Sequence, residues 1–115
     1  MLYKYNMSRS DRDDLIFKAL ADSRRRAILD LLKDAPRTTG ELCEHFEATL
    51  DRCTVMQHLK VLEKAELVLS RKEGRTRWNH LNAAPIQDIH ARWISSYATH
   101  AVKLLSKLKR DLEGD

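Results

Sequence analysis

The chain has few of the residues that interrupt helices or cross-link small folds. Its 115 residues include three glycines and two prolines, which argues against a loop-rich, all-β design. Two cysteines cannot form a disulfide framework, and no apolar run approaches the roughly 18 residues that suggest a membrane span. The N-terminal residues lack the apolar core of a secretory signal. We therefore expect a reduced, cytoplasmic protein without a membrane partner.

The residues that are present are typical of a folded, mainly helical protein. Hydrophobic residues make up 43% and charged residues 33% of the chain, and the length suits a single domain over residues 1–115. Residues 52–77 hold seven basic and three acidic side chains, a surplus of four that equals the formal net charge of the whole chain, +4. Such a local basic patch suits a nucleic acid or another anionic surface as the partner.

Two helices are expected at the start of the domain, whose core we place at about residues 11–82. From Ser10 to Ala21, apolar residues recur at helical spacing behind an acidic cluster, which suits the positive end of a helix dipole. Asp22 or Ser23 can cap a second helix, which has to end before Pro36.

Three arginines, Arg24, Arg25 and Arg26, crowd the first turn of this second helix. Cations are unfavourable at the positive end of the helix dipole, so one interpretation is that the arginines meet phosphate. The other is a solvated cluster in which one arginine has a buried aliphatic stem. The sequence leaves both interpretations equally open.

Residues 40–65 have the spacing of a helix-turn-helix. A short helix is expected over residues 40–46, a turn over 47–50, and a longer helix over 51–65 that Asp51 can cap. Val55, Leu59 and Leu62 form a single inward stripe on the longer helix.

A two-stranded hairpin is predicted directly after the longer helix. Leu67 and Leu69 alternate with their neighbours in the first strand, and Trp78 and His80 do so in the second. The residues that flank the turn are rich in cations, namely Arg71, Lys72, Arg75 and Arg77. The predicted fold class is therefore mainly α with a two-stranded β-wing, a winged helix-turn-helix.

A long terminal helix is predicted over residues 85–110, because apolar residues recur there at steps of three and four. It could pack only on its own core. Pairing with a second copy is the favoured interpretation, since two-fold binding to DNA needs a dimer. The predicted dimer contacts are Leu15, Ile86, Ile89, Trp93, Tyr97, Ala101, Leu104 and Leu108.

The inward stripe of the 51–65 helix leaves its other side chains for a major groove. Arg52 can donate two hydrogen bonds to guanine, Gln57 can pair with adenine, and Thr54 can contact phosphate or a thymine methyl. Lys60 lies further back, toward phosphate, while the wing cations can reach the backbone or the minor groove. The predicted contacts with double-stranded DNA are Arg52, Thr54, Gln57, His58, Lys60, Arg71, Lys72, Arg75 and Arg77.

Cys53, Met56 and His58 are less readily assigned. Cys53 and Met56 suit thymine methyls, but core packing is the preferred interpretation for both. His58 is expected to be half-buried and bonded to the backbone, while still lying near a phosphate.

Four segments of the chain carry a family resemblance. "LADSRRRAILDLL", "TTGELCEHF", "RCTVMQHLKVLEKAELV" and "RKEGRTRWNHLN" resemble, in order and spacing, the ArsR-type winged helix-turn-helix regulators over about residues 14–95. The resemblance implies a homodimeric repressor that occupies a palindromic operator until a signal relieves it. An enzyme is not expected, because no nucleophile, base and orienting group occur together at an interpretable spacing.

The thiolate metal sensors of this family carry a second cysteine two residues after the first, where this chain has Cys43 and His45. The resemblance therefore implies no thiolate site. The family's zinc sensors use an Asp-x-His and a later ligand pair. Asp88, His90 and His100 fit in part, but Lys103 occupies the last ligand position.

We accordingly expect neither a metal nor a cofactor. A metal-sensing repressor using Asp88, His90 and His100 is the alternative, and a winged-helix module that binds protein is another.

The resemblance also draws attention to Glu66, where the family usually has glycine after the recognition helix. Glycine would suit a left-handed cap, in which glutamate costs about 1 kcal/mol. Either this helix ends differently or the strain is tolerated.

Overall fold

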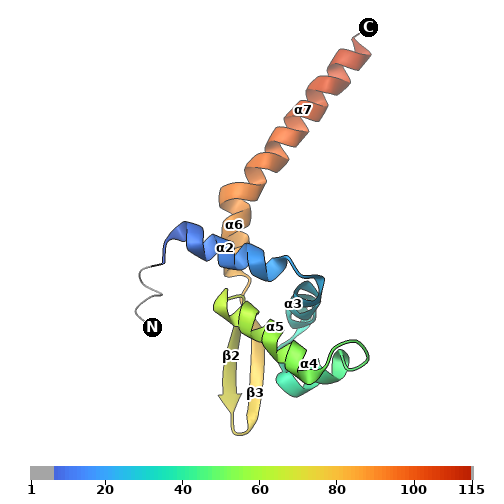
Figure 1. Ribbon diagram of the computed structural model, residues 1–115. Helices are drawn as coiled ribbons and strands as arrows, with labels where there is room; N and C mark the ends of the chain where they lie inside the picture. Colours follow the sequence, from blue (N-terminus) through green and yellow to red (C-terminus); the bar gives the residue numbers. More distant parts are fainter. Residues whose placement is uncertain (1–6, 115) are drawn as a thin grey trace. The chain divides into compact units, whose positions relative to one another are not determined.

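The computed structural model describes residues 7–114, and the described chain divides after Pro85 into two units. The expected single domain over residues 1–115 stays a prediction. The first unit contains helices α2 (Arg9–Leu20), α3 (Ser23–Asp34), α4 (Thr39–His45) and α5 (Arg52–Lys64), with strands β1 (Arg37–Thr38), β2 (Val68–Glu73) and β3 (Thr76–Leu81) (Figure 1).

The rest of the described chain is helical. Helix α6 (Ala84–Ile89) crosses the division, and one π-helical turn, η1 (His90–Ile94), leads into α7 (Ser95–Glu113). No helix among residues 7–114 is long and apolar enough to cross a membrane. The predicted class, mainly α with a β-wing, is confirmed.

Side chains at the predicted positions start two of the helices. Asp22 caps α3 by accepting a hydrogen bond from the Arg24 backbone N–H at 2.8 Å. Asp51 caps α5 by accepting one from the Thr54 N–H at 2.7 Å. Helix α2 begins one residue earlier than expected, because Ser8 is its N-cap. Local N-cap chemistry therefore fixes where these helices begin.

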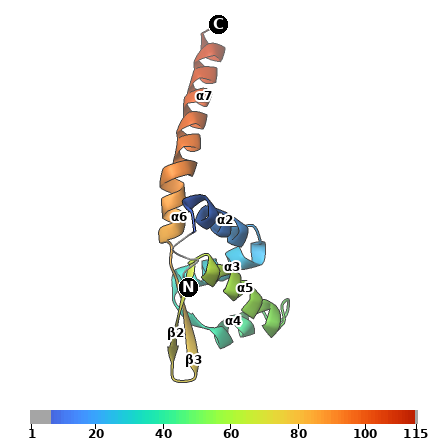
Figure 2. The ribbon, with the colours of Figure 1, turned by 60° about the vertical axis from the view of Figure 1, so that its left-hand side comes forward.

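The core of the first unit lies where α2, α3, α4 and α5 meet the base of the hairpin. Its buried apolar residues are Ile16, Ala19, Ile28, Leu29, Leu32, Leu42, Val55, Leu59, Leu62, Ala65, Leu67 and Val68. The predicted inward stripe of α5 is among them and is confirmed. Figures 1 and 2 place α4, the start of α5 and the hairpin tip toward the same end of this unit, with α2 at the other.

Strand β1 is an element that the sequence did not predict. It pairs antiparallel with β3, giving the order β1-β3-β2. Asn79 of β3 is fully buried, and its Nδ2 donates to the Arg37 carbonyl at 3.2 Å and to Thr39 Oγ1 at 3.1 Å. An inward amide at this position holds β1 and the start of α4 against the hairpin.

The predicted alternation of Leu67 and Leu69 is wrong. Leu67 precedes β2 and is fully buried, and the strand begins at Val68, which also faces inward. Because side chains alternate from the first strand residue onward, Leu69 faces out and is 53% exposed.

Helix α5 ends with Glu66 in the left-handed conformation, φ 60. The Leu67 N–H donates to the Leu62 carbonyl at 3.0 Å and the Glu66 N–H to the Glu63 carbonyl at 2.9 Å, the Schellman pattern. Asn82 supports this cap, since its Nδ2 donates to the Glu66 carbonyl at 2.8 Å and its backbone N–H to the Leu67 carbonyl at 2.9 Å. Of the two sequence alternatives, tolerated strain is the one observed.

The π-helical turn interrupts the predicted apolar stripe of the terminal helix. The Ser95 N–H donates to the His90 carbonyl, five residues back. Such a turn holds more residues than an α-helical turn, so apolar positions before and after it do not share one α-helical stripe. Ile89, before the turn, is 3% exposed, whereas Tyr97, after it, is 59% exposed.

Replacing Glu66 with glycine should raise the free energy of unfolding by up to about 1 kcal/mol. Relief of the left-handed strain should exceed the freedom that glycine adds to the unfolded chain. Urea unfolding followed by circular dichroism measures the difference. Lys64→Gly is the matched control, because glycine in the regular helix should lower stability by about 1 kcal/mol. Equal destabilisation by both substitutions would contradict a left-handed Glu66.

Candidate nucleic-acid interface

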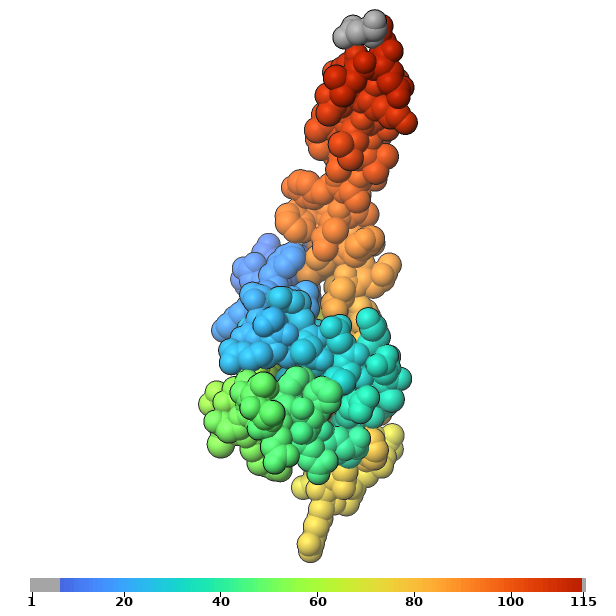
Figure 3. Space-filling model, turned by 90° about the vertical axis from the view of Figure 1, so that its right-hand side faces the viewer, coloured from blue at the N-terminus to red at the C-terminus, as the bar shows by residue number. Residues whose placement is uncertain are grey.

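Helix α5 presents an outward face opposite its buried stripe. This outward face consists of the exposed residues Cys53, Gln57, Lys60 and Lys64, together with Arg52, which is exposed as the first residue of the helix. In Figure 3 the green segment, which contains the turn before α5 and the start of the helix, bulges from the surface of the first unit. Lys64 was not among the predicted contacts, although its spacing of four residues from Lys60 places both on one side of the helix.

The expectation that Cys53 and Met56 pack in the core is wrong. Cys53 is exposed and Met56 is 37% exposed. Two residues correspond to about 200° of helix, so Cys53 points away from Val55, while Met56 lies about 100° from Val55 at the edge of the buried stripe. The two sulfur side chains therefore add apolar surface to a charged face.

Thr54 is half-buried and belongs to the N-cap of α5 as much as to its surface. Hydrogen bonds from Thr54, first from its backbone N–H and then from its side chain, hold the pKa of Asp51 below its usual value. Asp51 thus stays ionised at the helix start, where a carboxylate is favourable.

His58 is buried more deeply than predicted. It is 6% exposed, and its Nδ1 lies 3.3 Å from the Arg25 Nη1 instead of bonding to backbone. The sequence predicted a half-buried His58 ring near a phosphate. The structure places it inside the first unit because His58 follows Val55 by three residues and shares its buried side.

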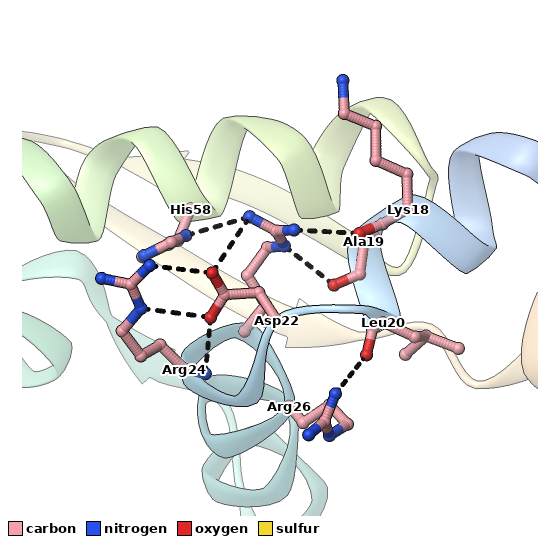
Figure 4. A network of polar contacts seen from close by, with 8 residues as sticks. Lys18, Ala19, Leu20, Asp22, Arg24, Arg26 and His58 are labelled. Carbon is pink, nitrogen blue, oxygen red and sulfur yellow. Dashed lines mark hydrogen bonds and ion pairs between the residues drawn. The ribbon is translucent and has the colours of Figure 1, made fainter.

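The arginine cluster of α3 is occupied by protein acceptors (Figure 4). Arg24 forms two side-chain hydrogen bonds with Asp22, at 2.9 and 3.1 Å, which hold the pKa of that carboxyl well below its usual range. Arg26 donates to the Leu20 carbonyl at 2.6 Å, and Arg25 is the arginine with the buried stem. These contacts favour a structural role over phosphate binding.

The wing tip is a two-residue turn. Gly74 has φ 62 at the first turn position, which is where a type II′ hairpin turn places glycine. Arg75 follows it, and Lys72 lies near the end of β2. Both are exposed. The hairpin therefore presents cations at its end.

The other two predicted wing cations lie beside carboxylates. Arg71 Nε is 3.8 Å from Glu73 Oε1, and Arg77 Nη1 is 3.8 Å from Glu63 Oε1 in α5. These distances belong to partly exposed pairs that contribute little to stability. Each pair nevertheless lowers the net positive charge that its arginine offers to a polyanion.

The alternative metal ligands do not come together. Asp88 Oδ2 accepts a hydrogen bond from Arg92 Nε at 2.8 Å and forms an ion pair with Arg92 Nη2, also at 2.8 Å. His90 and His100 are exposed, and Cys43 is half-buried. Within residues 7–114, no group of three or more histidine, cysteine, aspartate or glutamate side chains is arranged to hold a metal ion.

Comparisons with known proteins agree on one family. Residues 22–70 match the profile of the bacterial regulatory proteins of the arsR family. The transcriptional repressor SdpR of Bacillus subtilis (strain 168) is 37% identical over 73 residues, which cover 64% of this chain and 79% of SdpR.

Solved structures share the fold. The crystal structure of the ArsR family transcriptional regulator RHA00566 has a TM-score of 0.70 and 29% identity, covering 80% of this chain and 92% of that one. Mb0332 of Mycobacterium bovis, a homodimeric winged helix-turn-helix DNA-binding domain, has a TM-score of 0.61 and 24% identity, covering 91% of this chain and 85% of that one. With the helix-turn-helix and wing described above, these matches show that the chain belongs to the ArsR family of bacterial transcriptional regulators.

Proposed function

We propose that this DNA-binding regulator is a homodimeric repressor that occupies a palindromic operator through α5 and the β2–β3 wing. The observation that carries the proposal is the outward face of α5, where base-reading and cationic side chains lie opposite a fully buried stripe. The repressor role is supported by the similarity to SdpR. An α-helix with a basic face fits into the major groove of B-DNA.

The outward face divides into base contacts and phosphate contacts. Arg52, the first residue of α5, suits guanine, and Gln57, five residues later, suits adenine. Cys53 and Met56 offer apolar atoms to thymine methyl groups. Lys60 and Lys64, with the wing-tip cations Lys72 and Arg75, suit phosphates and provide the part of the binding that depends on salt.

The terminal helix supports a dimer. Helix α7 exposes large apolar side chains at helical spacing, and Trp93 and Tyr97 form an edge-to-face pair with ring centroids 5.2 Å apart. We propose that this face packs against a second copy, as a homodimer is the state of Mb0332. Its exposed members are Trp93, Ile94, Tyr97, Ala101, Val102, Leu104, Leu105, Leu108 and Leu112.

The other predicted dimer contacts are less exposed. Leu15 and Ile86 are half-buried, and Ile89 is almost completely buried within the chain. Ile89 is therefore left out of the proposed interface.

Arg52→Ala should weaken operator binding by about 1–3 kcal/mol and relax the sequence preference, because a bidentate contact with one base is lost. The operator is first obtained by in vitro selection with the purified protein. Affinities for operator and random duplexes are then measured by fluorescence anisotropy at several salt concentrations.

Arg75→Ala is the matched control for this experiment, since Arg75 is an exposed cation at the wing tip. It should weaken binding to both duplexes alike. It should also reduce the slope of the logarithm of affinity against the logarithm of salt concentration by about one unit. Equal losses on both duplexes for Arg52→Ala would count against base reading. An affinity for all DNA that does not depend on salt would favour the protein-binding alternative.

Leu104→Glu should shift the protein from dimer to monomer. Each dimer would bury two copies of Leu104, and losing both should cost roughly 3–6 kcal/mol, which is more than about 100-fold in the dimer dissociation constant. Sedimentation equilibrium measures the mass, and Trp93→Glu should act in the same direction. Lys103→Glu, one residue away on the polar side of α7, should leave the dimer intact. A dimer mass unchanged in the Leu104 variant would remove α7 from the interface.

A further inference from the structure

Arg25 contacts three helices of the first unit with one side chain. Its Nε donates to the Ala19 carbonyl at 2.8 Å and its Nη2 to the Lys18 carbonyl at 2.9 Å, both in the last turn of α2. Its Nη1 lies 3.3 Å from His58 Nδ1 in α5 and 3.9 Å from Asp22 Oδ2, the N-cap of α3 (Figure 4). The side chain is 14% exposed, compared with 51% for Arg24.

The contact between Arg25 and His58 requires one tautomer of the imidazole. A guanidinium only donates hydrogen bonds, so His58 Nδ1 has to accept and cannot carry a proton. The proton of the neutral ring is then on Nε2, which is buried and has no hydrogen-bond partner among residues 7–114. Protonation of Nδ1 would place a second donor and a second positive charge opposite the guanidinium.

Burial disfavours the protonated form of His58. It is the largest of the effects that lower the pKa of His58 below the ordinary 6.5; the Asp22 carboxylate raises this pKa, and the cations Arg24 and Arg25 of α3 lower it. Asp22 is already bonded to Arg24, and the Lys18 ammonium points away from the ring (Figure 4). The surroundings of His58 from α2, α3 and α5 therefore fit a neutral imidazole.

His58 also lies within the part of α5 that carries the outward face. It directly follows Gln57 and is one turn after Thr54. A shift of α5 at His58 would therefore move the residues proposed to read bases. A misplacement of about 1 Å is large on the scale of a hydrogen bond to a base edge, which needs donor and acceptor within about 3 Å.

We propose that Arg25 and His58 are positioning residues that set α5 against α2 and α3, and that acidification breaks this contact by protonating His58, thereby weakening operator recognition. The part concerning recognition rests on the proposed function. The contact itself and the neutral tautomer do not depend on it.

The test compares wild type with His58→Asn. The asparagine Oδ1 takes the place of Nδ1 and can accept from Arg25, but it does not titrate between pH 5 and 8. The ratio of operator to random-DNA affinity is measured over this range at constant ionic strength. It should fall severalfold in wild type toward the acid end of this range and stay level in His58→Asn. Using this ratio removes the general gain in affinity that other histidines confer when they are protonated.

His100→Asn is the control, because His100 is an exposed histidine of α7 outside the first unit. It should follow the wild-type pH profile. Wild-type pH dependence in His58→Asn, or full operator affinity at pH 8 in His58→Leu, would overturn the positioning role. If His58→Asn does not fold, Arg25→Lys replaces it, since one ammonium cannot reproduce the planar fork and operator preference should then be lost already at pH 8.

Two measurements made without DNA keep the contact testable if the proposed function fails. Nitrogen NMR of the imidazole should show an unprotonated Nδ1 and a protonated Nε2 at pH 8, and a protonated Nδ1 would overturn the proposal. Because folding favours neutral His58, the unfolded chain binds more protons below pH 6.5. The stability of wild type relative to His58→Asn should therefore fall as the pH drops below about 6.5 and level off below the folded pKa, and parallel stabilities would exclude the contact.

Discussion

Val55, Leu59 and Leu62 bury one stripe of α5 where it meets α2, α3, α4 and β2. Each of these side chains contributes about 1.5–3 kcal/mol by leaving water. Once that stripe is buried, the opposite face is fixed as the exposed one. The same burial therefore stabilises the first unit and selects the side chains that a DNA groove could meet.

The parts of this arrangement that depend on nearest neighbours could be predicted from the sequence. The N-caps at Asp22 and Asp51, the stripe of α5 and the turn at Gly74 each involve residues within about four positions of one another. The outward positions of Gln57 and Lys60 follow from the stripe by helical geometry, whereas Arg52 is exposed as the first residue of the helix. The prediction for Cys53 and Met56 was wrong because it relied on the apolar character of their side chains. Their angles from Val55 around the helix would have placed both outside the buried stripe.

Other features depend on contacts between distant segments. Asn79 reaches Arg37 and Thr39 across some forty residues, and Arg25 reaches His58 across 33, so no local pattern reveals them. The π-helical turn of the terminal helix was missed because Ile89, Trp93 and Tyr97 fit an α-helical spacing equally well in the sequence. The sequence also could not show what the arginines of α3 bind, because the carbonyl groups that accept from Arg25 and Arg26 lie at the end of α2 and approach them only in the folded chain.

The left-handed Glu66 has a geometric consequence for the wing. Asn82, just after β3, donates to the carbonyls of both Glu66 and Leu67, so the base of the hairpin and the end of α5 share one set of hydrogen bonds. Strands of six residues extend about 20 Å from that base. Over this length, a rotation of about 10° at Glu66 would displace the wing tip by about 3 Å. One backbone conformation at the end of the helix therefore sets which phosphate along a DNA strand the wing-tip cations could reach.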